Sequence, residues 1–289
     1  MPDLKNPKAA IPVVLMAGIL WSFGPYVVRH IDQPDLVPWQ YLFTRGIVIF
    51  CLLNIYLFLQ EGIKFYKNYL KIGLSGIIGG VGLGTAMISF IWSITNTTAA
   101  VTLLCLAAMP FITALLGFLF LKEKISLTVW ISILVASFGI VIMALGNLEE
   151  NTLMGLIMGL ISALGFSIFS VSLRWRKRTP KFTTVAVAGL FCFLFSSTMI
   201  SINDANFLSS SKNEALFATH GTIVCLGLIL YSIGSKNIPA TDLTLLSLTE
   251  VIGGIFWVWL PLFGINEIPS TNTIIGGFFL FVSLTYYSL

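Results

Sequence analysis

The sequence predicts an all-α integral membrane protein with ten transmembrane helices, arranged as two inverted five-helix repeats. Three observations predict this class: the composition, a succession of long apolar segments, and an internal match between the two halves of the chain. Of the 289 residues, 57% are hydrophobic and 10% are charged, whereas soluble domains average roughly 45–50% and about 25%. So little charge cannot cover a protein surface in water, and we therefore expect lipid to be the main solvent.

Apolar segments long enough to cross a bilayer occur ten times along the chain. Each is close to the length of about 20 residues that a helix needs to cross a hydrocarbon core about 30 Å thick. Charged and turn-forming residues separate the segments, as at 33–35 and 209–211. The predicted spans are residues 11–31, 39–59, 70–93, 99–121, 127–146, 153–173, 183–202, 216–235, 240–263 and 273–289.

Basic residues between the spans predict the orientation, because Lys and Arg in short loops favour the cytoplasmic side. With these spans, 13 of the 16 Lys and Arg residues fall on the side of both termini. Arg29 and Lys212 fall on the other side, and Arg45 lies inside a span. We therefore expect a multi-pass protein of the cell (inner, cytoplasmic) membrane with both termini in the cytoplasm. This topology explains the net charge of +4, so we expect no nucleic acid partner.

The two halves of the chain match one another weakly at a nearly constant offset. Residues 18–24 resemble 159–165 at an offset of 141, and 100–110 resemble 240–250 at an offset of 140. The match predicts one five-helix repeat at 1–147 and a second at 148–289. Because five is odd, the second repeat must enter the membrane from the opposite face. Inverted repeats around a midplane site are typical of secondary transporters, although a repeat can also serve assembly alone.

Short motifs add a family resemblance that extends over essentially the whole chain. The first span carries WSFG at 21–24, and the second has Pro38 followed by Arg45. The fourth carries LCLAAMP at 104–110 and ends in FLKEKIS at 120–126. In these motifs the sequence resembles the EamA-type members of the drug/metabolite transporter superfamily. It departs from their pattern at Glu250, where a proline is common.

The resemblance implies a DMT/EamA-like transporter fold of ten helices around a central cavity. It also implies transport of amino acids, related amphiphilic metabolites or drugs. In this fold the cavity is lined mainly by the spans predicted at 11–31, 70–93, 99–121, 153–173, 216–235 and 240–263.

Charged residues inside spans are candidates for the site, because each costs roughly 2.5–3.5 kcal/mol to insert. Glu250 lies in the middle of a span, where it could bind a substrate ammonium group or carry a coupled proton; the alternative is a neutral contact between helices. Arg45 could meet a substrate carboxylate or pair with Glu250, or could instead anchor its own helix. Asp242 lies near a helix start, where a carboxylate suits the positive helix end.

Aromatic and hydroxyl side chains on the expected cavity helices are further candidates, with packing and intrahelical hydrogen bonds as their alternatives. The aromatic candidates are Trp21, Tyr26, Phe90, Trp92 and Tyr231. The hydroxyl candidates are Ser22, Thr85, Ser89, Ser247 and Thr249. Pro110 is expected to kink its helix, with gating as one consequence, because proline removes a backbone hydrogen bond.

The function predicted from these features is secondary active transport of amino acids or related small amphiphilic metabolites by alternating access, with proton coupling or exchange as the driving process. The alternatives are uptake or exchange of a cationic metabolite such as S-adenosylmethionine, and a lipid flippase or channel on the same scaffold. A membrane-embedded enzyme is disfavoured, because both histidines, His30 and His220, lie close to the ends of predicted spans.

The expected partners are a small-molecule substrate and the lipid bilayer. The lipid-facing Gly and Ala residues fit either a monomer or a homodimer. No cofactor or metal is expected, because the four cysteines are widely separated within apolar segments.

Overall fold

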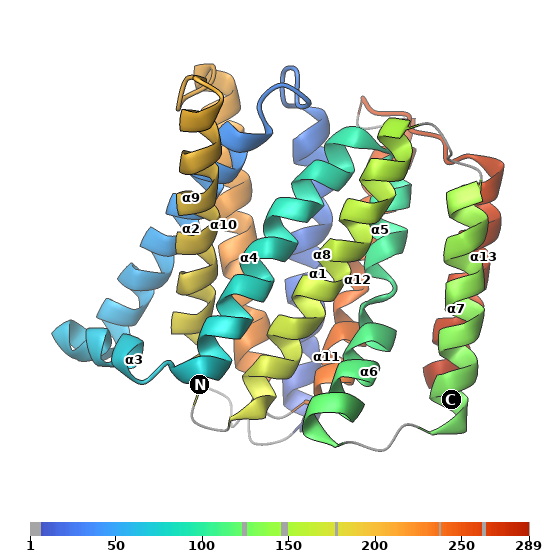
Figure 1. Cartoon of the computed structure of the whole chain (residues 1–289), viewed down its shortest axis with the longest axis horizontal. Helices are drawn as coiled ribbons and strands as arrows, with labels where there is room; N and C mark the ends of the chain where they lie inside the picture. The colour runs from blue at the N-terminus through green and yellow to red at the C-terminus, as the bar shows by residue number, and fades with distance from the viewer. Residues whose placement is uncertain are drawn as a thin grey trace.

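A computed structural model describes residues 7–122, 126–145, 150–176, 179–236, 238–261 and 264–288. Within these ranges every regular element is a helix, which confirms the predicted all-α class. The long helices stand side by side (Figure 1), and both chain ends lie on the same side of the bundle. We call that side the terminal face and the opposite side the far face.

The helices of the described ranges follow the predicted spans closely. In chain order they are α1 (Pro7–Arg29), α2 (Pro38–Glu61), the 3₁₀ helix η1 (Gly62–Tyr66), α3 (Lys67–Leu70), α4 (Gly73–Asn96), α5 (Ala99–Leu106), α6 (Met109–Leu121), α7 (Leu127–Leu145), α8 (Glu150–Trp175), α9 (Lys181–Ile202), α10 (Ser211–Gly234), α11 (Ala240–Ser247), α12 (Thr249–Trp259) and α13 (Thr271–Ser288).

Ten membrane crossings account for these helices. Among the described residues, nine segments are long and apolar enough to cross a bilayer. Two of them, Ala99–Leu121 and Ala240–Trp259, are each built from two successive helices, α5 with α6 and α11 with α12. The remaining crossing is α13, which is shorter in its apolar part and packs against α7. The fold class predicted from the sequence is therefore confirmed.

Helix packing follows a pattern that supports the predicted repeats. Extensively packed pairs include α4 with α8, α1 with α10, α2 with α9, and α7 with α13. Numbered along the chain, these pairs join crossings 3 and 6, 1 and 8, 2 and 7, and 5 and 10. If each crossing is replaced by its counterpart in the other repeat, five positions away, the first two pairs change places and the last two stay the same. A two-fold relation between residues 1–147 and 148–289 would produce this pattern. The pattern supports the division into inverted repeats, which stays a prediction.

Glycine pairs set the closest helix contacts. A Cβ atom on Gly165 of α8 would lie 2.5 Å from the carbonyl oxygen of Gly82 in α4. A Cβ atom on Gly139 of α7 would lie 2.6 Å from the carbonyl oxygen of Gly276 in α13. Side chains larger than hydrogen would force these backbones apart, so the glycines allow the close approach that is typical of membrane helices.

Two crossings are broken within the bilayer. In the fourth crossing, α5 ends at Leu106 and α6 begins at Met109, with Pro110 in its first turn. Proline has no N–H to donate to the carbonyl four residues earlier, and the helix breaks just before it. In the ninth crossing, α11 ends at Ser247 and α12 begins at Thr249, so Glu250 lies in the first turn of a half-helix.

Charge is distributed unequally between the two faces. The helix ends and their adjoining residues on the terminal face include Lys8, Lys64, Lys67, Lys71, Lys122, Arg174, Arg176, Lys181 and Lys236, and those on the far face include Arg29 and Lys212. Lys5, Lys124, Lys177 and Arg178, also assigned to the basic side, lie outside the described residues, as do residues 123–125 of the FLKEKIS motif. That the terminal face is cytoplasmic stays a prediction.

Candidate functional site

A central cavity of about 60 Å³ lies beside both helix breaks. Eight helices from both predicted repeats contribute to its wall: α1, α2, α4, α5, α6, α8, α10 and α12. The lining residues are Trp21, Arg45, Leu83, Ala86, Met87, Phe90, Leu106, Met109, Ser162, Phe166, His220, Val224, Leu228 and Glu250. Metabolite sites usually measure about 300–1,000 Å³, so the described conformation is contracted around its centre.

Two residues of opposite charge, Arg45 and Glu250, line this cavity together. Arg45 of α2 is only 5% exposed, and its Nε and Nη1 atoms have no hydrogen-bond partner among the described residues. Glu250 of α12 is half-buried and interacts electrostatically with Arg45. The direct ion pairs of the described residues are formed by other side chains. The two charges are therefore near one another but leave N–H groups of Arg45 available.

A buried tyrosine and histidine lie next to Arg45. The Tyr41 hydroxyl contacts Nδ1 of His220, and its ring stacks on Phe217 with centroids 4.7 Å apart. Both Tyr41 and His220 interact electrostatically with Arg45. The expectation that His220 lies close to a span end is wrong: α10 begins at Ser211, earlier than the predicted start at 216, so His220 lies well inside the helix and is 1% exposed.

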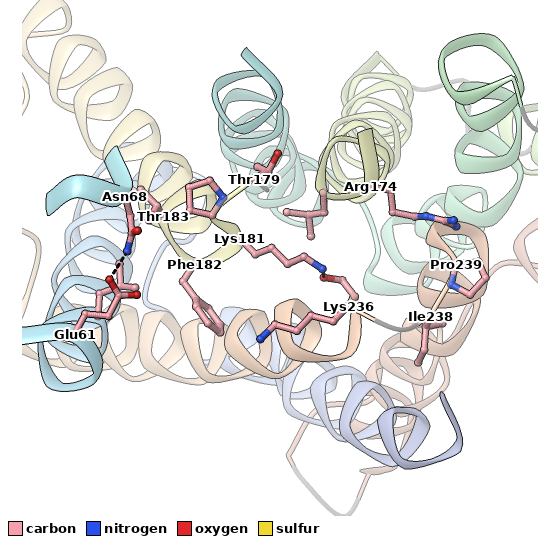
Figure 2. Close-up of a pocket in the computed structure, with 14 residues that line it drawn as sticks. Glu61, Asn68, Arg174, Thr179, Lys181, Phe182, Thr183, Lys236, Ile238 and Pro239 are labelled. Carbon is pink, nitrogen blue, oxygen red and sulfur yellow. Dashed lines mark hydrogen bonds between the residues drawn. The ribbon is translucent and has the colours of Figure 1, made fainter. Parts of the chain in front are cut away.

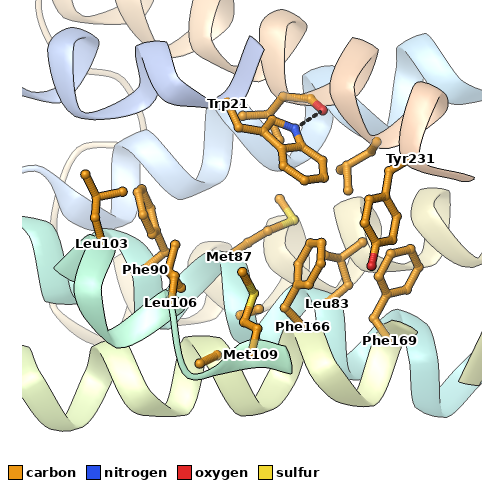
Figure 3. Close-up of a cluster of buried hydrophobic side chains, with 14 of the residues drawn as sticks. Trp21, Leu83, Met87, Phe90, Leu103, Leu106, Met109, Phe166, Phe169 and Tyr231 are labelled. Atoms are coloured by element: carbon orange, nitrogen blue, oxygen red, sulfur yellow. Dashed lines mark hydrogen bonds between the residues drawn. The ribbon is translucent and has the colours of Figure 1, made fainter. Parts of the chain in front are cut away.

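Aromatic rings form one wall of the cavity (Figure 3). The Trp21 indole N–H donates to the carbonyl oxygen of Val224 at 3.2 Å, which holds the ring in place. Phe166 lies edge-on to Trp21 with centroids 5.6 Å apart. Tyr231 lies behind these rings, is fully buried, and its hydroxyl is 2.7 Å from Ser170 Oγ. Of the predicted aromatic candidates, Trp21 and Phe90 line the cavity and Tyr231 supports it from behind.

Three of the predicted hydroxyl candidates bond to nearby backbone instead of lining the cavity. Ser22 Oγ donates to the Ile19 carbonyl at 2.7 Å and accepts from Trp257 Nε1 at 3.1 Å. Ser247 Oγ donates to the Thr244 carbonyl of its own helix at 2.8 Å, and Thr249 Oγ1 of α12 donates to the Leu246 carbonyl of α11 at 3.2 Å. These hydrogen bonds agree with the alternative prediction, in which the hydroxyl groups bond to helix backbone instead of to substrate.

The remaining candidates also lie away from the central cavity. Thr85 lines a separate apolar groove of about 330 Å³ between α4 and α8. Trp92 packs on Trp39 with centroids 5.1 Å apart, and Tyr26 packs on His30 at 4.5 Å. Ser89 is buried in α4 without lining the cavity. The structure therefore brings together only Glu250, Arg45, Trp21 and Phe90 from the predicted set.

A cluster that we call the latch joins helix ends on the far face; it is made of Arg29, Glu267 and the carbonyls of Ile94 and Thr97. Arg29 Nε donates to Glu267 Oε2 at 2.9 Å, Nη1 donates to Ile94 O at 2.7 Å, and Nη2 donates to Thr97 O at 3.0 Å. Glu267 Oε1 also accepts from the Ala99 amide at 2.5 Å. The latch thus ties together the far ends of α1, α4 and α5 and the segment between α12 and α13.

Comparison with known proteins defines the class of this chain. A protein of Helicobacter pylori strain J99, named an uncharacterized transporter, is 25% identical over 260 residues, which cover 86% of this chain and 84% of the relative. A protein of Haemophilus influenzae strain Rd with the same name is 26% identical over 263 residues, covering 84% and 82%. Together with the fold, these relatives indicate a multi-pass membrane transporter rather than an enzyme.

The family match is more specific. Residues 8–145 match the EamA-like transporter family, and the resemblance predicted from the motifs within residues 21–126 is thereby confirmed. The first half of the chain is thus similar to transporters of the EamA type, within the drug/metabolite transporter superfamily. A solved crystal structure aligns with 97% of this chain and 97% of its own at a TM-score of 0.67 and 17% identity, which shows the fold alone.

Proposed function

We propose that this transporter is a secondary active carrier of amino acids or related small zwitterionic metabolites. The observation that carries the proposal is the placement of Arg45 and Glu250 in one cavity beside the two helix breaks. A buried charge is costly unless it is paired. A zwitterionic substrate would supply both counter-charges at once, its carboxylate to the unpartnered N–H groups of Arg45 and its ammonium group to Glu250.

The apolar part of the cavity suits the side chain of such a substrate. Trp21, Phe90 and Phe166 provide aromatic surface, and Met87 and Met109 provide flexible thioethers on the same wall. Methionine side chains adapt to ligands of different shape. The wall therefore favours an amphiphilic amino acid over a small polar one.

The size of the cavity supports a mechanism that needs movement. With about 60 Å³ available, no amino acid fits in the described conformation. The helices around Arg45 and Glu250 must separate before substrate enters and close again behind it. Rocking of two repeats about a central site would accomplish this, as alternating access requires.

A cationic metabolite such as S-adenosylmethionine is the second candidate. Glu250 and the rings of Trp21 and Phe166 would attract its sulfonium and ammonium groups. Arg45 lines the same cavity and would repel them, since its positive charge has no direct ion-pair partner among the described residues. Because of this repulsion, we favour a zwitterionic substrate over a cationic one.

Counterflow in proteoliposomes tests the proposal. Vesicles loaded with neutral, aromatic or basic amino acids, or with S-adenosylmethionine, would be diluted into the labelled compound. Saturable exchange of one amino acid class is the expected result, and Arg45→Gln should lower it strongly while Arg176→Gln, which removes an exposed arginine, should not. Exchange of lipid, ionic current, or no exchange by correctly folded protein would overturn it.

A further inference from the structure

A second pocket, of about 890 Å³, opens on the terminal face (Figure 2). It lies where the ends of α8, α9, α10 and α11 meet the end of α2, and it shares no lining residue with the central cavity. We call it the terminal-face pocket. Its lining residues are Leu57, Glu61, Asn68, Leu173, Arg174, Thr179, Pro180, Lys181, Phe182, Thr183, Ser235, Lys236, Ile238 and Pro239.

Positive charge is concentrated in this pocket. Arg174, Lys181 and Lys236 all line it, and the Lys181 ammonium group interacts with the like charges of the other two. Lys181 Nζ donates to Ser235 Oγ at 2.8 Å, a neutral partner. Neither Lys181 nor Lys236 forms an ion pair with a carboxylate in the described part of the chain. Glu61, the one carboxylate among the lining residues, accepts a hydrogen bond from Asn68 at 2.8 Å.

The backbone adds further positive potential. Helix α9 begins at Lys181 after Pro180, with no side-chain cap and no acidic residue in its first turn. A helix N-terminus of this kind presents free N–H groups and a partial positive charge. Helix α11 also begins at the pocket after Pro239 without a side-chain cap, although Asp242 in its first turn offsets part of its field.

An unsatisfied hydroxyl group points to a missing ligand. Thr183 stands in the first turn of α9, lines the pocket and is fully buried. Its Oγ1 atom has no hydrogen-bond partner among the described residues. Buried hydroxyls are normally bonded, and the Thr183 hydroxyl has no partner among the described residues. The two lysines have no anionic partner among these residues either.

We propose that the terminal-face pocket binds a phosphate group, either the headgroup phosphate of an anionic phospholipid or the phosphate of a soluble ester. A phosphate offers several acceptor oxygens to the donors that line the pocket, and helix N-termini and lysines are its usual partners. The pocket lies at helix ends, where lipid headgroups lie, and basic pockets between membrane helices bind such headgroups. The proposal is independent of the substrate of the central cavity.

Two binding measurements on the full-length protein in detergent test this site. Native mass spectrometry would compare retention of phosphatidylglycerol with retention of diacylglycerol, which has no phosphate. Thermal unfolding followed by tryptophan fluorescence would compare inorganic pyrophosphate with chloride at equal ionic strength. Retention of phosphatidylglycerol alone would identify the lipid headgroup as the source, and stabilisation by pyrophosphate alone would identify a soluble ester.

Variants decide whether the effect belongs to this pocket. Lys181→Gln/Lys236→Gln should weaken binding roughly thirtyfold, since each basic residue near an anionic surface contributes about fivefold. The matched control Lys64→Gln/Lys71→Gln removes two exposed lysines of the same face and should leave binding unchanged.

Thr183→Val keeps the shape of the side chain and should weaken binding by a smaller factor, about fivefold. This variant also decides the question if the double lysine variant does not fold. Equal responses of the pocket and control variants in both measurements, or no response of the wild-type protein to either ligand, would overturn the proposal.

Discussion

The two faces of the bundle differ in whether their charged side chains are paired with other groups of the chain. On the far face, Arg29 and Glu267 satisfy one another, and Arg29 also bonds to two backbone carbonyls. On the terminal face, Lys181 and Lys236 line an open pocket of about 890 Å³ without a carboxylate partner. One face is thus closed by contacts within the chain, whereas the other offers charges to something outside it.

This difference between the faces indicates which contacts would change during the proposed transport cycle. Contacts that close a face must be broken when that face opens, so the latch would open and close in each cycle of an alternating-access carrier. Among the residues that the structure describes, the lysines of the terminal-face pocket make no such contact with a carboxylate. We therefore expect the far face to respond most strongly to removal of an internal contact, and the terminal face to respond to external anions.

The largest effect is expected from breaking the latch with Arg29→Gln. The change leaves the carboxylate of Glu267, whose side chain is 17% exposed, without its cation. Removing one partner of a buried pair costs about 3–5 kcal/mol, and partial exposure reduces this to roughly 2–3 kcal/mol. Thermal unfolding in detergent should show the loss.

The same variant should also open the far face. A Phe90→Cys reporter in the cavity should react with an impermeant thiol reagent applied from the far side roughly tenfold faster when Arg29→Gln is present. The labelling rate of the reporter is the rate measured with Phe90→Cys minus the rate measured without it. Unchanged labelling together with unchanged stability would mean that the latch does not hold this face closed.

The next effect concerns the site between the two faces. Arg45→Gln removes the cation that we propose binds the substrate carboxylate, and a charge-assisted hydrogen bond contributes about 1.5–3 kcal/mol. Exchange at subsaturating substrate should therefore fall roughly 10–100-fold. A normal exchange rate in this variant, with Arg176→Gln as the matched control, would remove Arg45 from the substrate site.

A smaller, qualitative effect is expected from Glu250→Gln. The amide keeps the shape of the side chain but cannot exchange a proton. If this carboxyl carries a coupled proton, an imposed pH gradient should change flux in the wild-type protein and leave flux in the variant unaffected. The control Asp204→Asn alters an exposed carboxylate and should keep the wild-type response. The same pH response in all three proteins would exclude Glu250 as the coupling group.

Much of the fold could be predicted from the sequence because the bilayer imposes a length on each crossing. Hydropathy alone located ten spans, and the structure agrees with their number and order. The apolar segment begins later than α10 because the first turn of this helix, Ser211 to Glu214, is polar. This difference is what concealed His220 as a residue of the helix interior.

The site could be predicted only where a residue is unusual in its surroundings. Arg45 and Glu250 were found because charges are rare inside apolar spans. Met87 and Phe166 line the same cavity but look like any other apolar residue of their helices. The latch was missed for a different reason: Arg29 and Glu267 are 238 positions apart, and nothing local connects them.

The smallest effect is expected from Lys212→Gln, which removes the second ion pair of the far face. Lys212 Nζ lies 2.5 Å from Asp32 Oδ1, but both side chains are 59% exposed. Water and salt screen such a pair, and its contribution to stability is about 0–1 kcal/mol. The variant should unfold within a few degrees of the wild-type protein and should not speed labelling of Phe90→Cys from the far side. If it weakens the far face as much as Arg29→Gln, closure depends on the total charge pairing of that face, and the latch is not its main contact.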